Sequence, residues 1–214
     1  MADCNNENKT LVNDLYQMDL KEYQNYIKER LISLYPDTEI ITEWNAMKDE
    51  RELDFYSPRI DAAIGPFATN GRYEDVYDQM VENPKWGALI NRLLNFNNDN
   101  LAGYNQFTRP PDYHEIVYQN SNARCFMGIE IENKVSRKHL LGGAINASAL
   151  SRIGIVIPWS DDKLRAFIRL VRYFQYLKLA EKNTFNTTNL LIITKEQFLS
   201  ALNYPPLIRP HGLD

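Results

Sequence analysis

The sequence has little cysteine, no long apolar run and no excess of positive charge. Its 214 residues include two cysteines, Cys4 in a polar N-terminal stretch and Cys125 in an apolar segment. Two such cysteines do not make a disulfide framework, so we expect a reduced, cytoplasmic protein. No apolar run approaches ~18 residues, and the N-terminus lacks the basic-then-apolar pattern of a secretion signal. We therefore expect no membrane association.

Several signatures of catalysis or binding are also missing. The three histidines, His114, His139 and His211, show no zinc-ligand spacing. There is no Gly-Lys-Ser/Thr phosphate loop and no dinucleotide fingerprint. Neither Ser148 nor Ser151 lies in a Gly-x-Ser-x-Gly context. The net charge of -4 does not by itself indicate a nucleic-acid partner, although clustered cations could still provide one.

What is present fits one globular domain, residues 1–214, because the chain is 44% hydrophobic and long enough to bury a sizeable core. Hydrophobic periodicity and turn residues predict an α/β or α+β fold, with a central mixed β-sheet flanked by helices. We expect strands over 38–44, 55–65, 114–118, 124–134, 153–158 and 190–194. We expect helices over 20–35, 73–96 (in two pieces broken near Pro84), 136–150, 161–182 and 195–202. Asp19 and Glu22 resemble a capping box, Ser136 is a candidate cap, and 97–111 reads as an irregular loop.

The strand over 124–134 ends in charged residues. Alternate side chains of a strand share a face, so Glu130, Glu132 and Lys134 should point the same way. Two carboxylates and a lysine on a buried face are costly unless they pair or hold a metal. A structural Glu–Lys pair at a sheet end is the simpler interpretation.

A further acid, Asp61, lies inside the strand predicted over 55–65, among small and aliphatic neighbours. An acidic residue is disfavoured in the middle of a strand, so its presence there calls for an explanation. The simplest explanation is that the strand lies at the edge of the sheet and Asp61 faces water. Asp112 is its rival as the first acid of a site, because Pro111-Asp112 precedes the Glu130–Glu132 strand at shorter spacing. Its simpler interpretation is a loop residue after two prolines.

A strand Asp, then Glu132-Asn133-Lys134 at a strand end, then a helix and a buried strand resembles the PD-(D/E)xK nuclease superfamily. The resemblance covers roughly 20–158. It implies a restriction-endonuclease-like fold and Mg²⁺, with Mn²⁺ as substitute, bound by Asp61, Glu132 and the backbone carbonyl of Asn133. Lys134 would orient the attacking water. About 70 residues separate Asp61 from Glu132, so the fit requires 69–111 to be a helical insertion.

The chemistry needs these residue types. Hydrolysis of a phosphodiester requires activated water and neutralised charge on the phosphate. Hard carboxylate oxygens bind Mg²⁺, which lowers the pKa of a bound water. Glu130 could help bind a second metal or pair with a neighbouring cation, and both interpretations stay open.

Cations that could hold a polyanion follow the site. Arg137 and Lys138 come directly after it, and Arg165, Arg169 and Arg172 form a stripe on the helix over 161–182. Exposed basic turns and solvated helix faces look similar. The sequence therefore favours a metal-dependent nuclease acting on DNA, with RNA open. The alternatives are a non-catalytic nucleic-acid-binding or protein-interaction module of the same fold, and an assembly role for 69–111, for instance in a homodimer.

Overall fold

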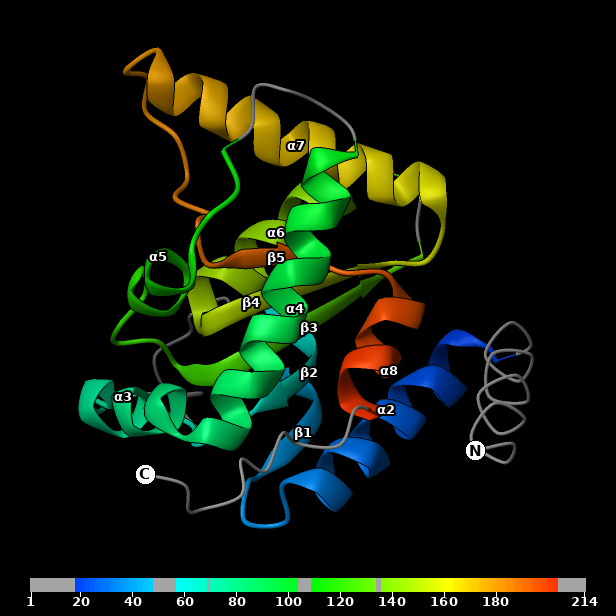
Figure 1. Cartoon of the computed structure of the whole chain (residues 1–214), viewed down its shortest axis with the longest axis vertical. Helices are drawn as coiled ribbons and strands as arrows, with labels where there is room; N and C mark the ends of the chain where they lie inside the picture. The colour runs from blue at the N-terminus through cyan, green and yellow to red at the C-terminus, as the bar shows by residue number, and fades with distance from the viewer. Residues whose placement is uncertain (1–17, 48–56, 69, 104–108, 134–135, 204–214) are drawn as a thin grey trace, which may run out of the picture.

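The computed structural model describes residues 18–47, 57–68, 70–103, 109–133 and 136–203. Within them the chain is a mixed α/β fold with five strands and seven helices (Figure 1). The strands are β1 (Ile40–Asn45), β2 (Arg59–Ile64), β3 (Cys125–Glu132), β4 (Ser151–Pro158) and β5 (Leu190–Ile192). The helices are α2 (Leu20–Leu34), α3 (Glu74–Glu82), α4 (Pro84–Ala102), α5 (Tyr113–Tyr118), α6 (Arg137–Leu150), α7 (Asp161–Leu179) and α8 (Lys195–Asn203).

The five strands form one mixed sheet in the order β1-β2-β3-β4-β5. The pairs β1–β2 and β2–β3 are antiparallel, whereas β3–β4 and β4–β5 are parallel. Parallel neighbours need a crossover connection, and α6 and α7 provide the two that are required. β3 is consequently the central strand, where the antiparallel and parallel halves of the sheet meet.

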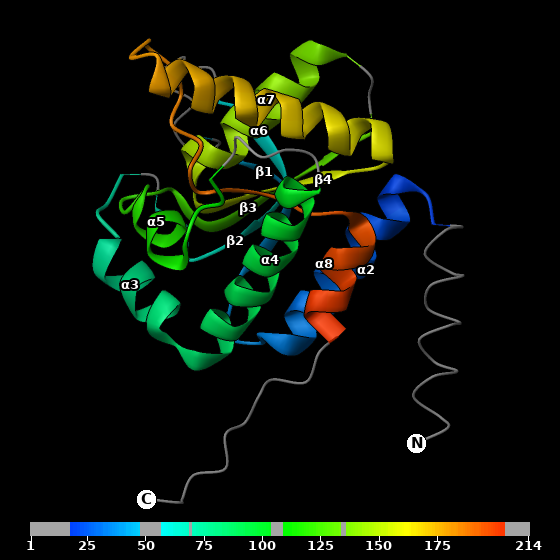
Figure 2. The same cartoon turned by 45° about the horizontal axis from the view of Figure 1, so that its top comes forward.

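Helices cover both faces of the sheet, which gives three layers (Figure 2). α6 and α7 lie on one face and form a small core with β4 and β5 around Ala144, Val156 and Phe167. α2, α3, α4, α5 and α8 lie on the other face, over a larger core that includes Ile129 and Ile131 of β3. No helix within the described ranges is long and apolar enough to cross a bilayer.

The segment predicted as an insertion, 69–111, is built into the larger core. Tyr77 of α3 and Leu89 and Ile90 of α4 are almost fully buried in it, and Trp86 stacks edge-on against Phe126 of β3. Deleting this segment would therefore expose one face of the sheet, so its function has to be tested by point substitutions.

α4 is longer than its sequence pattern predicts. It continues to Ala102, so the first part of the predicted 97–111 loop is helical, while 104–108 lie outside the described residues. Asn97 is buried, and its Oδ1 accepts a hydrogen bond from the Ile192 N–H at 2.9 Å, which satisfies the buried amide. Asn100 donates a hydrogen bond to the Ile192 carbonyl at 2.9 Å. Polar residues that read as a loop thus cover the open edge of β5.

The predicted strand over 114–118 is wrong, because these residues belong to the helix α5. Asp112 and Glu115 form a capping box at its start. The apolar pair inside this segment suits either a strand or a helix, and the hydrogen bonds of the capping box favour the helix. The capping box of Asp19 and Glu22 at α2 is confirmed. Ser136 precedes α6, but its side chain makes no capping hydrogen bond.

Candidate active site

The site begins where β2 separates from β3. The two strands pair from Ile64–Met127 to Ala62–Ile129. Just before Ala62 in the chain, the Asp61 Oδ2 accepts a hydrogen bond from the Ile131 N–H at 2.6 Å. The Asp61 carboxylate thus acts as an acceptor for a strand amide at the point where the ladder ends. β2 lies between β1 and β3, so the interpretation of Asp61 as an edge-strand residue is wrong.

Glu43 of β1 is an acidic neighbour of Asp61 that no sequence pattern predicted, and its charge raises the Asp61 pKa. The β1–β2 ladder includes Thr42–Ala62 and Trp44–Ile60, which places Glu43 opposite Asp61. Glu43 has a φ of 53°, a left-handed conformation that is uncommon for a residue other than glycine. Strained backbone of this kind clusters at functional sites. Only the register of the folded sheet reveals this pairing, since nothing in the local sequence marks Glu43.

Glu130 lies between the sheet and α6. Its neighbours Ile129 and Ile131 point into the core on the other face, and Gly143 of α6 lies over the Glu130 side chain. A Cβ on Gly143 would lie 3.8 Å from the Glu130 Cβ, which is an ordinary packing distance. The helix therefore covers part of the Glu130 side chain, which is half-buried as a whole and has its Oε1 atom buried.

The surroundings of Glu130 disfavour its ionised form. Burial raises its pKa to about 9, and the charge of Asp61 adds to the effect, followed by the charges of Glu132 and Glu43. A hydrogen bond with the Asn146 side chain of α6 acts in the opposite direction. The Oε1 atom is buried, and no described residue forms a hydrogen bond with it.

Asp61 is affected in the same direction. Its pKa is raised to about 6, mainly by burial and further by the charges of Glu43 and Glu132. The hydrogen bond from the Ile131 N–H and the charge of Arg59 act in the opposite direction. Arg59 also pairs with Glu43 across exposed side chains at 3.5 Å. The charge of Asp61 thus disfavours ionisation of Glu130, and the charge of Glu132 acts on both carboxyl groups, an effect that a bound cation would relieve.

Glu132 and Asn133 complete the described part of the site. The Glu132 carbonyl accepts a hydrogen bond from the Trp159 N–H at 3.0 Å, which fixes the end of β3 to β4. Glu132 is half-buried, and its charge reaches both Asp61 and Glu130. Asn133 is exposed and, with Glu43 and Asn25 of α2, lines an open cleft of about 580 Å³. Lys134 lies outside the described residues, so its role stays a prediction.

The chemistry of these side chains fits a divalent cation. The oxygens are hard carboxylates, burial and neighbouring acids raise the pKa of Asp61 and Glu130, and one buried Glu130 oxygen has no hydrogen bond from the described part of the chain. Geometry provides no direct support, because within the described ranges no three His, Cys, Asp or Glu side chains form a group that could hold a metal.

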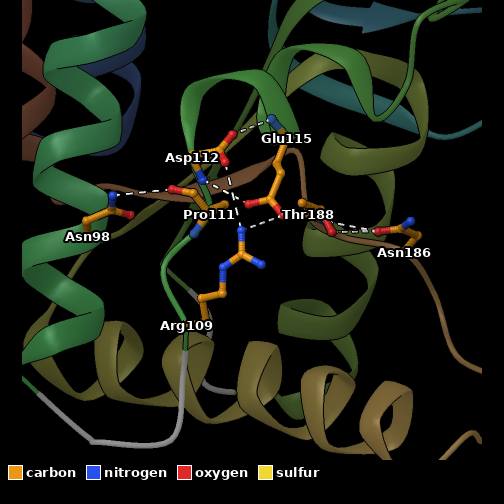
Figure 3. A network of polar contacts seen from close by, with 7 residues as sticks. All are labelled: Asn98, Arg109, Pro111, Asp112, Glu115, Asn186 and Thr188. Atoms are coloured by element: carbon orange, nitrogen blue, oxygen red, sulfur yellow. Dashed lines mark hydrogen bonds and ion pairs between the residues drawn. The ribbon is translucent and has the colours of Figure 1, made fainter.

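The rival acid, Asp112, is placed elsewhere and is already satisfied (Figure 3). Its Oδ1 accepts the Glu115 N–H at 2.9 Å, and its Oδ2 lies 3.8 Å from a guanidinium nitrogen of Arg109. Arg109 also pairs with the Glu115 carboxylate at 2.9 Å. None of the charges that raise the pKa of Asp61 or Glu130 comes from Asp112. Asp112 thus has a local structural role at the start of α5.

The predicted cations lie on helices that begin at the same edge of the sheet. α6 follows β3 along the chain, and both views place the N-terminal end of α7 near the end of β3 (Figures 1 and 2). Lys138 of α6 is exposed, while the side chain of Arg137 lies outside the described residues. Arg165 and Arg169 are exposed on α7, and Arg172 is half-buried there. The N-terminal ends of helices carry partial positive charge, and acidic residues in the first turns of α2 and α7 already lie against it.

Comparison of this chain with protein-family models, curated proteins and solved structures finds no match.

Proposed function

We propose that this protein is a Mg²⁺-dependent nuclease that hydrolyses phosphodiester bonds of DNA, on a fold of the restriction-endonuclease-like type. One observation carries the proposal: Asp61, Glu130 and Glu132 lie where the β2–β3 ladder ends, and burial together with neighbouring acids raises the pKa of the first two. A stable fold has little reason to place acids against each other under a helix unless a cation joins them. A reduced, cytoplasmic setting belongs to the same proposal, since Cys125 is a buried free thiol.

Asp61 and Glu132 would hold the metal, with the Asn133 carbonyl as a third donor. The chemistry that a bound Mg²⁺ supplies is the activation of water and the neutralisation of charge on the phosphate. Asp61 keeps one oxygen on the Ile131 N–H, which orients its other oxygen. Lys134 would position the attacking water, as the PD-(D/E)xK resemblance implies. Glu130, covered by α6, would act as a further donor or as a proton-holding neighbour.

The test is a cleavage assay with supercoiled plasmid and labelled linear DNA, with RNA as a second substrate, in Mg²⁺ or Mn²⁺ and in chelator. We expect cleavage that needs the metal and is abolished by Lys134→Ala while the thermal unfolding midpoint is unchanged. Glu82→Gln, an exposed acid at the end of α3, is the matched control and should cleave normally. Absence of cleavage with every substrate in both metals would overturn the proposal.

A second candidate is a non-catalytic nucleic-acid-binding or protein-interaction module of the same fold. It is favoured by the lack of a pre-formed metal group within the described ranges. Calorimetric titration separates the two candidates. The nuclease should bind Mn²⁺ with an affinity that falls in Asp61→Asn, whereas a module that binds nucleic acid without metal should show no heat of Mn²⁺ binding.

A further inference from the structure

α7 has two chemically different faces. One face is packed against α6, β4 and β5 through Leu164, Phe167, Ile168 and Val171, and Phe174 is also buried. The opposite face, called here the outer face of α7, carries Arg165, Arg169, Tyr173 and Tyr176. Tyr173 and Tyr176 are 55% and 66% exposed. Exposed aromatic side chains that gather on one face of a helix can form an interaction surface.

The outer face of α7 lies in a positively charged part of an acidic protein. Residues 161–182 hold six lysines and arginines but three acids, in a chain whose net charge is -4. Two of the acids, Asp161 and Asp162, are at the start of the helix, and Glu181 lies beyond its end. Arg165 pairs with Asp162 at 3.9 Å between exposed side chains, a contact that water screens. The body of the helix thus presents cations to a polyanion.

The outer face of α7 starts at the candidate active site. Glu132 at the end of β3 is paired in register with Pro158 of β4, and α7 begins three residues after Pro158. Both views show α7 extending from this edge along the face of the sheet that α6 covers (Figures 1 and 2). At ~1.5 Å per residue, Tyr176 lies roughly 16 Å along the helix from Arg165. A strand lying on the face could therefore continue into the site.

We propose that the outer face of α7 binds single-stranded nucleic acid and guides the unpaired strand to the carboxylates; the inference rests on the proposed function and specifies its substrate. Guanidinium groups contact phosphates of any nucleic acid, but a tyrosine ring gains stacking energy only from a base that is not already stacked in a duplex. Arg165, Arg169, Tyr173 and Tyr176 combine both kinds of contact on one stripe. A surface for duplex DNA alone would need the cations and not the rings.

The experiment measures binding of the full-length protein to labelled oligonucleotides by fluorescence anisotropy in chelator, where no cleavage occurs. The probes are a 20-nucleotide single-stranded DNA, the RNA of the same sequence and the corresponding duplex. We expect the single strands to bind more tightly than the duplex. Tyr173→Ala and Tyr176→Ala should each weaken single-strand binding roughly 5- to 100-fold and leave duplex binding unchanged. Arg169→Gln should weaken both and reduce the salt slope by about 0.7.

Two matched controls separate stacking from general damage. Tyr176→Phe keeps the ring and should bind single strands as the wild type does. Tyr118→Ala removes an exposed tyrosine of α5, on the other side of the sheet, and should change nothing. Duplex binding as tight as single-strand binding, or unchanged affinity in both alanine variants, would overturn the inference. So would a dimer that Tyr176→Ala dissociates in light scattering, because the face would then bind a second copy.

The outcomes for the two proposals are distinguishable. If DNA is cleaved but the tyrosine variants bind and cleave as the wild type does, the single-strand inference fails and the nuclease proposal stands. If no DNA or RNA is cleaved but the tyrosine variants lose single-strand binding, the inference stands and the protein is a non-catalytic nucleic-acid-binding module.

Discussion

Two groups of acids in this protein look alike in the sequence and differ in the structure. Asp112 is the acid of a Pro-Asp pair and Glu115 follows it by three residues, and both carboxylates accept backbone amides and pair with Arg109 at the start of α5. Asp61 and Glu130 lie in neighbouring strands, where burial and other acids raise their pKa values. The difference teaches that similar acids in a sequence can be satisfied locally or be buried beside other acids, and the second kind is the better candidate for a functional site. A motif in the sequence is weaker evidence.

The largest expected effect separates the two groups by activity. Asp61→Asn keeps an oxygen that can accept the Ile131 N–H but removes the charge that would bind a metal, so we expect cleavage to fall at least ~100-fold. Asp112→Asn is the matched control: asparagine also caps helices, so its activity should stay within about twofold of the wild type. The rate of plasmid nicking in Mg²⁺ measures both. Loss of activity in the Asp112 variant alone would reverse the assignment of the first acid.

The next effect is stabilisation by metal. A saturating divalent cation that binds the folded protein should raise its thermal unfolding midpoint by roughly 5 °C. Protons compete for the same oxygens, so the increase should be larger at pH 8 than at pH 5.5, below the Asp61 pKa of about 6. Differential scanning fluorimetry with Mn²⁺ checks this. Asp61→Asn should lose the increase and Asp112→Asn should retain it; an equal increase in both variants would mean that the metal binds elsewhere.

The third effect is a dependence of stability on pH. Glu130 has an ordinary pKa of 4.5 when unfolded and about 9 when folded, so between these values only the unfolded chain releases the proton. The free energy of unfolding without metal should therefore fall as the pH rises from about 5 to about 9. Glu130→Gln should remove part of this fall and stabilise the protein at pH 8, with little effect at pH 4. Urea unfolding in chelator measures it.

Glu82→Gln, at an exposed position, is the control for this dependence. It should leave the pH profile unchanged. A Glu130→Gln profile parallel to that of the wild type would show that Glu130 is ionised in the folded state.

The smallest expected effect concerns Asp112, whose carboxylate already has hydrogen-bond and ion-pair partners. Asp112→Ala removes the N-cap of α5 and should cost about 1 kcal/mol of stability, with cleavage unchanged. The denaturant midpoint measures the loss, and Asp112→Asn should restore most of it. A loss of cleavage at full stability would contradict a purely structural role.

Much of the fold could be predicted from local pattern. The apolar run in 153–158 became β4, and the stripe of Leu164, Phe167 and Val171 became the buried face of α7. The prediction failed at α5 and at the end of α4. At α5, a capping box favours a helix over a strand for a segment with an apolar pair. At the end of α4, Asn97 and Asn100 form hydrogen bonds with the edge of a strand more than 90 residues away.

The sequence by itself determined that Glu130 and Glu132 share a face, because side chains alternate along any strand. It also singled out Asp61 as an acid in an unfavourable position inside a strand. The tertiary structure alone decided which acids meet. Strand register placed Glu43 opposite Asp61, the separation of β2 from β3 gave Asp61 the Ile131 N–H, and α6 closed over Glu130. The hydrogen bond between Asp61 and Ile131 joins residues 70 positions apart, and the local pattern of a single chain does not encode such contacts.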